Sequence, residues 1–142
     1  MQYIKHQTNK NFINSKGVKH MLATPFIWMM LPIFMVVDLF GEIYHRVCFP
    51  LYGIPFVKRA EYILIMDRNK LQYLNILQKF FCMYCGYVNG LLRYQKEVAG
   101  RTEHYWCGIM HESVKGFKMQ QDQIDQDFAK FNDPKDFKDK YF

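Results

Sequence analysis

CMYCGY, residues 82–87, has the form C-x-x-C-G followed by an aromatic residue, which is typical of a metal knuckle. In a knuckle two thiolates bind one ion from a tight turn, and a glycine after the second cysteine supplies the positive φ of that turn. Gly86 occupies this position. Downstream, a cysteine and a histidine four residues apart would share one face of a helical turn. The pattern C-x2-C-x21-C-x3-H therefore predicts a Cys3His metal site of Cys82, Cys85, Cys107 and His111.

Such a site constrains the path of the chain. If residues 82–111 formed one straight helix, Cys82 and Cys107 would stand about 37 Å apart at 1.5 Å per residue. Either the chain turns back between them, or a second copy supplies the other half of the site. The candidate break points are glycines: Gly86, Gly90 and Gly100. Alternatively, Cys82 and Cys85 are two small buried residues one helical turn apart. A redox C-x-x-C is disfavoured because the sequence shows almost no strand alternation.

The knuckle also belongs to a wider set of motifs. Residues 48–55 (CFPLYGIP), 66–75 (MDRNKLQYLN) and 101–111 (RTEHYWCGIMH) accompany it. Together they resemble an uncharacterised family of small bacterial membrane proteins with the patterns C-x-Y-C-x-Y-x-N-G and R-T-E-Q-Y-W-C-P-I-K-H. The resemblance covers about half of the chain. It implies an inner-membrane location and the same four metal ligands. His104 stands where the family has Gln, which argues against His104 as a ligand, and Gly108 stands where it has Pro.

Composition favours a membrane or protein interface. The chain has 142 residues, enough for one domain with tails, and aromatic residues make up 18% of it. Residues 1–22 carry four lysines and no acidic residue, and they precede an apolar stretch. A basic arm in this position is expected beside anionic lipid headgroups. Nucleic-acid binding is disfavoured, because the basic residues flank apolar segments instead of forming one dense stripe.

The apolar stretch at residues 21–40 is interrupted only by Thr24, Pro25, Pro32 and Asp38. Twenty helical residues measure about 30 Å, the thickness of a bilayer core. The stretch is therefore predicted to be membrane-embedded, either as a single pass or as a re-entrant helix that bends at Pro32. A core helix in a soluble bundle is the alternative. Basic residues lie on both flanks, so the positive-inside rule selects no orientation. The resemblance and the metal cysteines favour the bacterial inner membrane, with the metal domain facing the cytoplasm.

A polar stripe follows the apolar stretch. Asp38, Glu42 and either His45 or Arg46 recur at helical spacing. Glu-x-x-His is half of a carboxylate di-iron signature, but the chain holds no second copy of that motif. We expect instead an ion pair between Glu42 and Arg46 at i, i+4. A di-iron site shared with another subunit stays open.

The rest of the chain is predicted to be mostly α-helical. Asp67 is expected to cap a helix that leads into the knuckle, and a second helix is expected to end near Gly100, before a Thr102 cap. Pro50, Gly53 and Pro55 are expected to interrupt the helix in residues 47–57. The expected organisation is a basic arm (1–22), a membrane-associated segment (23–57), a helical metal-binding domain (58–113) and a polar, aromatic C-terminal tail (114–142).

No catalytic motif stands out: the sequence holds no Walker loop, no G-x-G-x-x-G, no H-E-x-x-H and no nucleophile elbow. A non-catalytic role is therefore expected. The favoured prediction is a membrane-anchored accessory or assembly subunit, stabilised by structural zinc, that docks onto a larger integral complex through its aromatic tail and can form homo-oligomers. The alternative is a membrane-tethered iron electron carrier. Its knuckle is similar to that of rubredoxin, although imidazole with thiolates is more usual for zinc.

Overall fold

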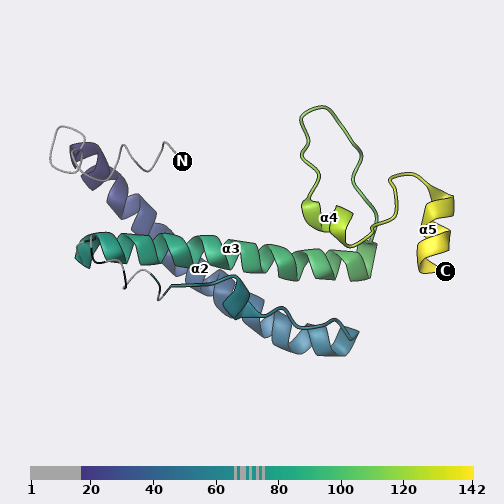
Figure 1. The fold of residues 1–142 in the computed structure, drawn as a ribbon, viewed down its shortest axis with the longest axis horizontal. Coiled ribbons are helices and arrows are strands. Elements are labelled where there is room, and N and C mark those ends of the chain that lie inside the picture. The colour runs from purple at the N-terminus through teal and green to yellow at the C-terminus, as the bar shows by residue number, and fades with distance from the viewer. Residues whose placement is uncertain (1–16, 66, 68–69, 71, 73, 75) are drawn as a thin grey trace. The chain divides into compact units, whose positions relative to one another are not determined.

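The computed structural model describes residues 17–65, 67, 70, 72, 74 and 76–142. These residues are mostly helical, and an apolar helix stands at the N-terminal end of the described chain, which confirms the predicted fold class. The elements are α2 (Gly17–Tyr52), a 3-10 turn η1 (Arg59–Glu61), α3 (Ile76–Cys107), α4 (Gln121–Asp125) and α5 (Pro134–Tyr141), shown in Figure 1. Residues 1–16 of the predicted basic arm lie outside the described residues.

The chain divides into two units, Met1–Phe40 and Gly41–Phe142, and the division falls within α2. In the first unit, α2 runs without interruption through Pro25 and Pro32. The reversal at Pro32 that a re-entrant helix requires does not occur. Proline lacks an N–H and normally breaks a helix in water, but apolar membrane helices tolerate it well. A single pass across a membrane stays a prediction.

The second unit begins with the last three turns of α2. The helix continues through Pro50 and ends at Tyr52, beyond the interruption predicted for this segment. Gly53 then adopts a φ of 69°, the backbone N–H of Gly53 donates to Pro50 O, and the N–H of Ile54 donates to Phe49 O. This pair of bonds is a Schellman cap, which uses a glycine with positive φ to close a helix. Gly53 therefore ends the helix, whereas Pro50 does not.

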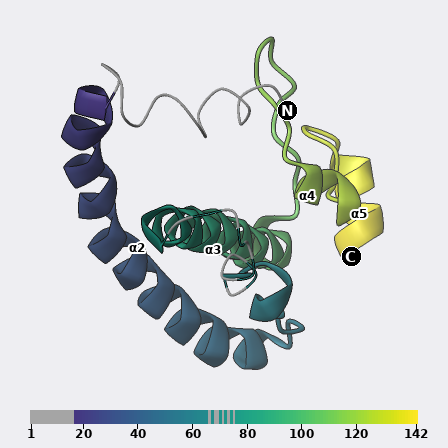
Figure 2. The same cartoon turned by 60° about the vertical axis from the view of Figure 1, so that its left-hand side comes forward.

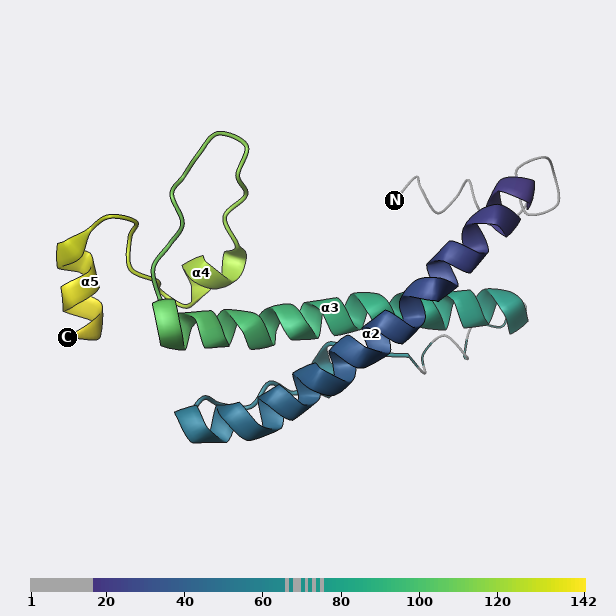
Figure 3. The same ribbon diagram turned by 180° about the vertical axis from the view of Figure 1, so that it is seen from behind.

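Residues 53–65 form a strap that runs back along α3, as Figures 1 and 3 show. The guanidinium of Arg101 donates to Pro55 O at 2.9 Å near the start of the strap. Further along, a Cβ built on Gly90 would lie 2.6 Å from Tyr62 O and 2.9 Å from the Cα of Ile63. The strap backbone therefore touches α3 where only glycine leaves room. Gly90 serves close packing and is not a break point.

Helix α3 is a single uninterrupted helix, seen obliquely along its axis in Figure 2. Its bounds correct two predictions: it begins at Ile76, later than the Asp67 cap predicts, and it passes through Gly100 to end at Cys107. Thr102 lies inside the helix and caps nothing. Its hydroxyl donates to Val98 O at 2.8 Å and also contacts the hydroxyl of Tyr44 on α2 at 2.9 Å. Helix α3 is therefore continuous at Gly100, where a helix end was expected.

The C-terminal residues fold onto the end of α3. Ile109 and Ala129 form an isolated parallel bridge, with N–H donation from Met110 to Ala129 O at 2.8 Å and from Ala129 to Gly108 O at 2.7 Å. Phe128 and Ala129 are fully buried. One aromatic residue of the predicted partner-docking tail, Phe128, is thus used inside the chain.

Candidate functional site

The four predicted metal ligands lie at two separate places. Cys82 and Cys85 lie in the N-terminal half of α3, and Cys107 is its last residue. His111 follows in an irregular segment. At 1.5 Å per residue, about 37 Å of helix separate Cys82 from Cys107. The described residues show no group of three or more histidine, cysteine, aspartate or glutamate side chains placed to hold a metal ion. Within the described chain, Cys82 and Cys85 therefore do not meet Cys107.

The tight turn of a metal knuckle does not form at Cys82 and Cys85. Gly86 is helical, and positive φ occurs among the described glycines only at Gly53 and Gly116. The amide of Asn89 donates to Cys85 O at 2.8 Å, so the knuckle sequence forms ordinary helix. Only the shared-site alternative remains for the four predicted ligands, because a break in α3 was the condition for a site within one chain.

The three cysteines of α3 nevertheless share one helical face. Cys107 follows Cys82 by almost seven full helical turns, at 100° per residue. Leu91, which is fully buried, lies half a turn out of phase with Cys82. Consistent with this, Cys85 and Cys107 are exposed and Cys82 is partly exposed. The thiols therefore point away from the core of the unit, which also excludes the alternative that Cys82 and Cys85 are buried packing residues.

His104 packs within the C-terminal fold. Its ring lies 5.2 Å from the ring of Phe128 and 6.3 Å from that of Tyr141. The hydroxyl of Tyr141 donates to Gly108 O at 2.9 Å, and a Cβ at Gly108 would collide with that hydroxyl. Burial raises the pKa of Tyr141, which keeps the hydroxyl protonated as a donor. A packing role for His104 agrees with its predicted role as a bystander.

A buried polar network joins α2, α3 and the strap. Tyr94, fully buried on α3, donates its hydroxyl to Glu42 Oε2 at 3.0 Å and contacts His45 Nδ1 at 2.9 Å. The other ring nitrogen of His45, Nε2, accepts the backbone N–H of Val57 at 3.0 Å. The predicted ion pair is confirmed, because Arg46 Nε donates to Glu42 Oε1 at 2.7 Å.

This network sets the chemical state of His45. Because Nε2 accepts a hydrogen bond from an N–H, it carries no proton, so the ring is neutral with its proton on Nδ1. Nδ1–H then donates to the Tyr94 oxygen, whose own proton goes to Glu42. Both nitrogens of His45 are therefore engaged, and neither is directed at a metal. The Glu42-x-x-His45 motif serves helix packing here, which removes the observation behind the di-iron alternative.

One cavity opens beside this network, and a second lies nearer the C-terminal end of α3. The first, of about 510 Å³, is lined by Glu42, His45, Arg46, Phe56, Val57, Arg59 and Tyr94. Arg59 NH1 lies 3.8 Å from Glu42 Oε2, and its guanidinium stands 5.6 Å above the centre of the Tyr94 ring. This geometry combines an ion pair with a cation–π contact. Two guanidinium groups therefore face one carboxylate.

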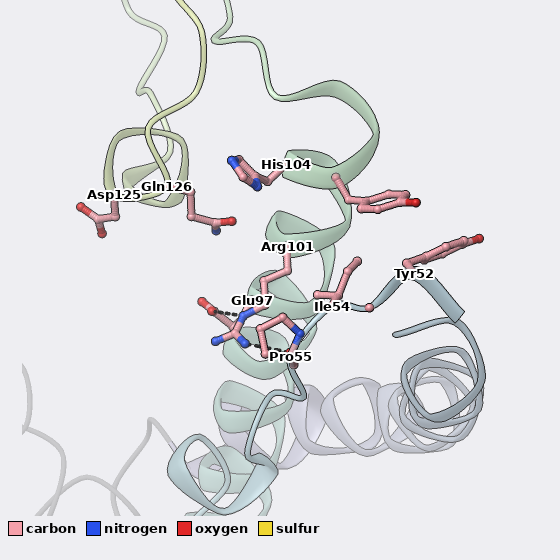
Figure 4. A pocket seen from close by; sticks show the side chains of 10 residues that line it. Tyr52, Ile54, Pro55, Glu97, Arg101, His104, Asp125 and Gln126 are labelled. Atoms are coloured by element: carbon pink, nitrogen blue, oxygen red, sulfur yellow. Dashed lines mark hydrogen bonds and ion pairs between the residues drawn. The ribbon is translucent and has the colours of Figure 1, made fainter. Parts of the chain in front are cut away.

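The second cavity, of about 580 Å³, lies between the strap and the C-terminal part of α3 (Figure 4). Figure 4 shows Arg101 reaching both Glu97 and Pro55, with His104 further along α3 and with Asp125 and Gln126 across from α3. Since one guanidinium group bonds both to Glu97 on α3 and to Pro55 O in the strap, Arg101 holds the strap on α3. Burial raises the pKa of Tyr62 nearby, and the Glu97 carboxylate raises it further. At this cavity the contacts of Arg101 therefore serve to hold the strap on α3.

Sequence reasoning identified some of these residues and missed others. Glu42 and either His45 or Arg46 were predicted as part of a polar stripe, whereas Tyr94 was not predicted as a site residue. Arg59 was counted only among the basic residues that flank the apolar stretch, and Arg101 only within the predicted helix end near Gly100. Arg59 meets Glu42, 17 residues away, and Arg101 meets Pro55 O, 46 residues away, in addition to its i, i+4 partner Glu97. No local sequence pattern predicts the two distant contacts.

Comparison with known proteins found no matching family model, no matching curated protein and no matching solved structure.

Proposed function

We propose that this protein is a membrane-anchored, non-catalytic accessory or assembly subunit of a larger integral complex in the bacterial inner membrane. The observation that carries the proposal is the Met21–Tyr52 portion of α2. It is long and apolar enough to cross a membrane, and none of its most apolar 18-residue window is buried within the chain. A core helix of a soluble protein would bury that window. Burial in lipid instead satisfies the hydrophobic side chains.

Length assigns different roles to the two parts of this helix. Thirty-two residues measure about 48 Å, well over the roughly 30 Å of a bilayer core. Residues 21–40 alone match that thickness. The remaining turns carry Glu42, His45 and Arg46 and pack on α3, which suits the headgroup region and water. We therefore place Gly41–Phe142 outside the hydrocarbon core, on the cytoplasmic side.

Exposed aromatic residues supply the surface for the partner complex. Tyr52 stacks on Tyr105 at 5.0 Å, and Trp106 packs edge-on against both rings at 5.4 Å. About half of Tyr105 and 65% of Trp106 are nonetheless exposed. Tyrosine and tryptophan clusters of this kind are typical anchors of protein interfaces. Phe142, 98% exposed, offers a further anchor at the C-terminus.

The metal proposal now involves two chains. Zinc bound by Cys82 and Cys85 of one copy with Cys107 and His111 of another would complete a four-ligand site. The outward direction of all three thiols supports this arrangement. The electron-carrier alternative requires the same four ligands, and therefore the same second chain, with iron in place of zinc.

Thiol labelling of intact cells tests both the anchor and its orientation. The full-length protein should stay with membranes during alkaline carbonate extraction and dissolve in detergent. Cys85 and Cys107 are exposed, so a membrane-impermeant maleimide should label them only after the inner membrane is broken and any bound zinc is removed with a chelator. A Cys85→Ser, Cys107→Ser double variant controls for the remaining cysteines. Labelling in intact spheroplasts would indicate the opposite orientation. Recovery as a soluble protein without detergent would contradict the membrane anchor.

Complementation tests the shared metal site. A variant with Cys82→Ser and Cys85→Ser and a variant with Cys107→Ser and His111→Ala should each bind no zinc alone. When the two are expressed together, one intact site per mixed pair should restore zinc. Metal analysis that finds no recovery in the mixture would contradict a site shared between copies.

A further inference from the structure

We propose that the cavity beside Tyr94 binds the phosphodiester headgroup of an anionic phospholipid. This inference rests on the proposed membrane anchor and adds a specific ligand to it. The cavity of about 510 Å³ lies within the usual size range of ligand pockets, about 300–1,000 Å³. Its lining joins Arg46 and Arg59 with the single carboxylate of Glu42.

Charge complementarity identifies the ligand class. His45 is neutral, because its Nε2 accepts the N–H of Val57. Two guanidinium groups and one carboxylate therefore leave the lining with a net charge of +1. A phosphodiester carries one negative charge, so its binding would neutralise the cavity. Guanidinium groups match phosphate oxygens with two parallel N–H bonds, which favours phosphate over a spherical anion.

Glu42 is held in a way that leaves room for such a ligand. Its two oxygens accept hydrogen bonds from Arg46 Nε at 2.7 Å and from the Tyr94 hydroxyl at 3.0 Å. Arg59 lies at 3.8 Å, outside hydrogen-bond distance, and interacts with the carboxylate through its charge. Its side chain is 38% exposed, and that of Arg46 is 74% exposed. A phosphate can therefore approach both guanidinium groups from solvent without displacing the Tyr94 bond.

The position of the cavity along α2 points to a lipid source. Glu42 follows the apolar residues 21–40 by two positions, about 3 Å of helix, and the side chain of Arg46, one turn further on, reaches back to Glu42. The polar headgroup layer of a bilayer is about 5–7 Å thick on each side of the hydrocarbon core. The cavity is also lined by Phe56, 54% exposed, an apolar side chain that suits the boundary between headgroup and acyl chains.

Lipid retention by the full-length protein tests the proposal. The protein is purified from nanodiscs of phosphatidylcholine with a minor share of phosphatidylglycerol, and retained lipid is measured by native mass spectrometry. The wild-type chain should retain phosphatidylglycerol over phosphatidylcholine. Arg59→Gln should lower that preference by about tenfold, the loss of one charge-assisted contact. Lys58→Gln is the matched control, because Lys58 is the neighbouring cation, lies outside the cavity and is 80% exposed.

The outcomes separate this site from the anchor. Equal retention of the two lipids by the wild-type chain, or equal loss in Arg59→Gln and Lys58→Gln, would overturn the site and leave the anchor standing. Release of phosphatidylglycerol by inorganic phosphate would show a soluble anion as the ligand and overturn the lipid assignment. Arg59→Lys keeps the charge but loses the planar fork, so it should recover part of the preference with an unchanged circular dichroism spectrum.

Discussion

The two parts of α2 on either side of Gly41 use the same helical backbone for opposite purposes. In residues 21–40 the side chains are apolar, and most of the large ones are exposed, for example Phe26 at 68% and Met29 at 61%. Residues 41–52 are more polar, yet they contain the fully buried Phe49 and the nearly buried His45. The apolar composition of a segment therefore predicts that it forms a helix. It does not predict whether other parts of the chain cover that helix. The polar half packs within the chain because Tyr44 bonds to Thr102 and because Glu42 and His45 bond to the Tyr94 hydroxyl on α3.

The largest expected effect comes from charging the apolar half. Ile33→Lys combined with Val37→Lys should remove the protein from the membrane fraction, because each lysine at the centre of a spanning helix costs about 2.5–3.5 kcal/mol of insertion free energy. Carbonate extraction and immunoblotting measure the effect. Val47→Lys is the control in the polar half: Val47 is 54% exposed, so its lysine should leave membrane recovery unchanged. A double variant that stays fully membrane-bound would mean that lipid does not cover residues 21–40.

Removing a phenyl ring should lower the free energy of unfolding by different amounts in the two parts of α2. Phe49→Ala should lower the free energy of unfolding of the Gly41–Phe142 unit by about 3–5 kcal/mol, since it empties a fully buried site. Phe26→Ala, in the apolar half, should change it by less than about 0.5 kcal/mol. Denaturant unfolding of the full chain in detergent, followed by circular dichroism, measures both variants. Equal losses would show that the apolar half takes part in the same core.

The same contrast explains what sequence could and could not predict. The fold class, the long apolar helix and the Glu42–Arg46 pair follow from periodicity and spacing, which are local properties. The course of α3 does not. Gly90 and Gly100 favour a helix break locally, but the strap backbone packs on Gly90, and Thr102 bonds to Val98 O and to Tyr44. Tertiary contacts of this kind override local propensity.

The candidate site shows the same limit. The spacing of Cys82, Cys85, Cys107 and His111 fits a metal site, but spacing cannot reveal that an uninterrupted α3 separates the pairs. The network around Tyr94 was missed for the converse reason. A tyrosine on an apolar helical face is assigned to the core, and its hydroxyl becomes informative only when Glu42 and His45 are known to meet it.

A single hydroxyl in the polar half should have a smaller but specific effect. Tyr94→Phe keeps the buried ring but leaves the Nδ1–H of His45 without its partner and Glu42 with one donor fewer. The free energy of unfolding should fall by about 1–3 kcal/mol, the cost of an unsatisfied buried polar group. Tyr105→Phe is the control, because Tyr105 is half exposed and should tolerate the change. Histidine NMR should report a changed environment of His45 in the first variant alone, and an unchanged His45 signal there would contradict the network.

The smallest effect is expected at Gly41, where the two halves meet. A Cβ at this position would collide with the amide end of Gln95, a flexible side chain whose Nε2 has no hydrogen-bond partner in the described part of the chain. Gln95 can therefore rotate away at little cost, and alanine favours the helix over glycine by about 1 kcal/mol. Gly41→Ala should thus change stability by less than about 1 kcal/mol in either direction. Gly90→Ala is the comparison: its Cβ would meet the backbone of Tyr62 and Ile63, which cannot rotate away, so it should destabilise by about 1–3 kcal/mol. If denaturant unfolding gave Gly41→Ala the larger loss, the packing of the polar half on α3 would be tighter at Gly41 than at the strap.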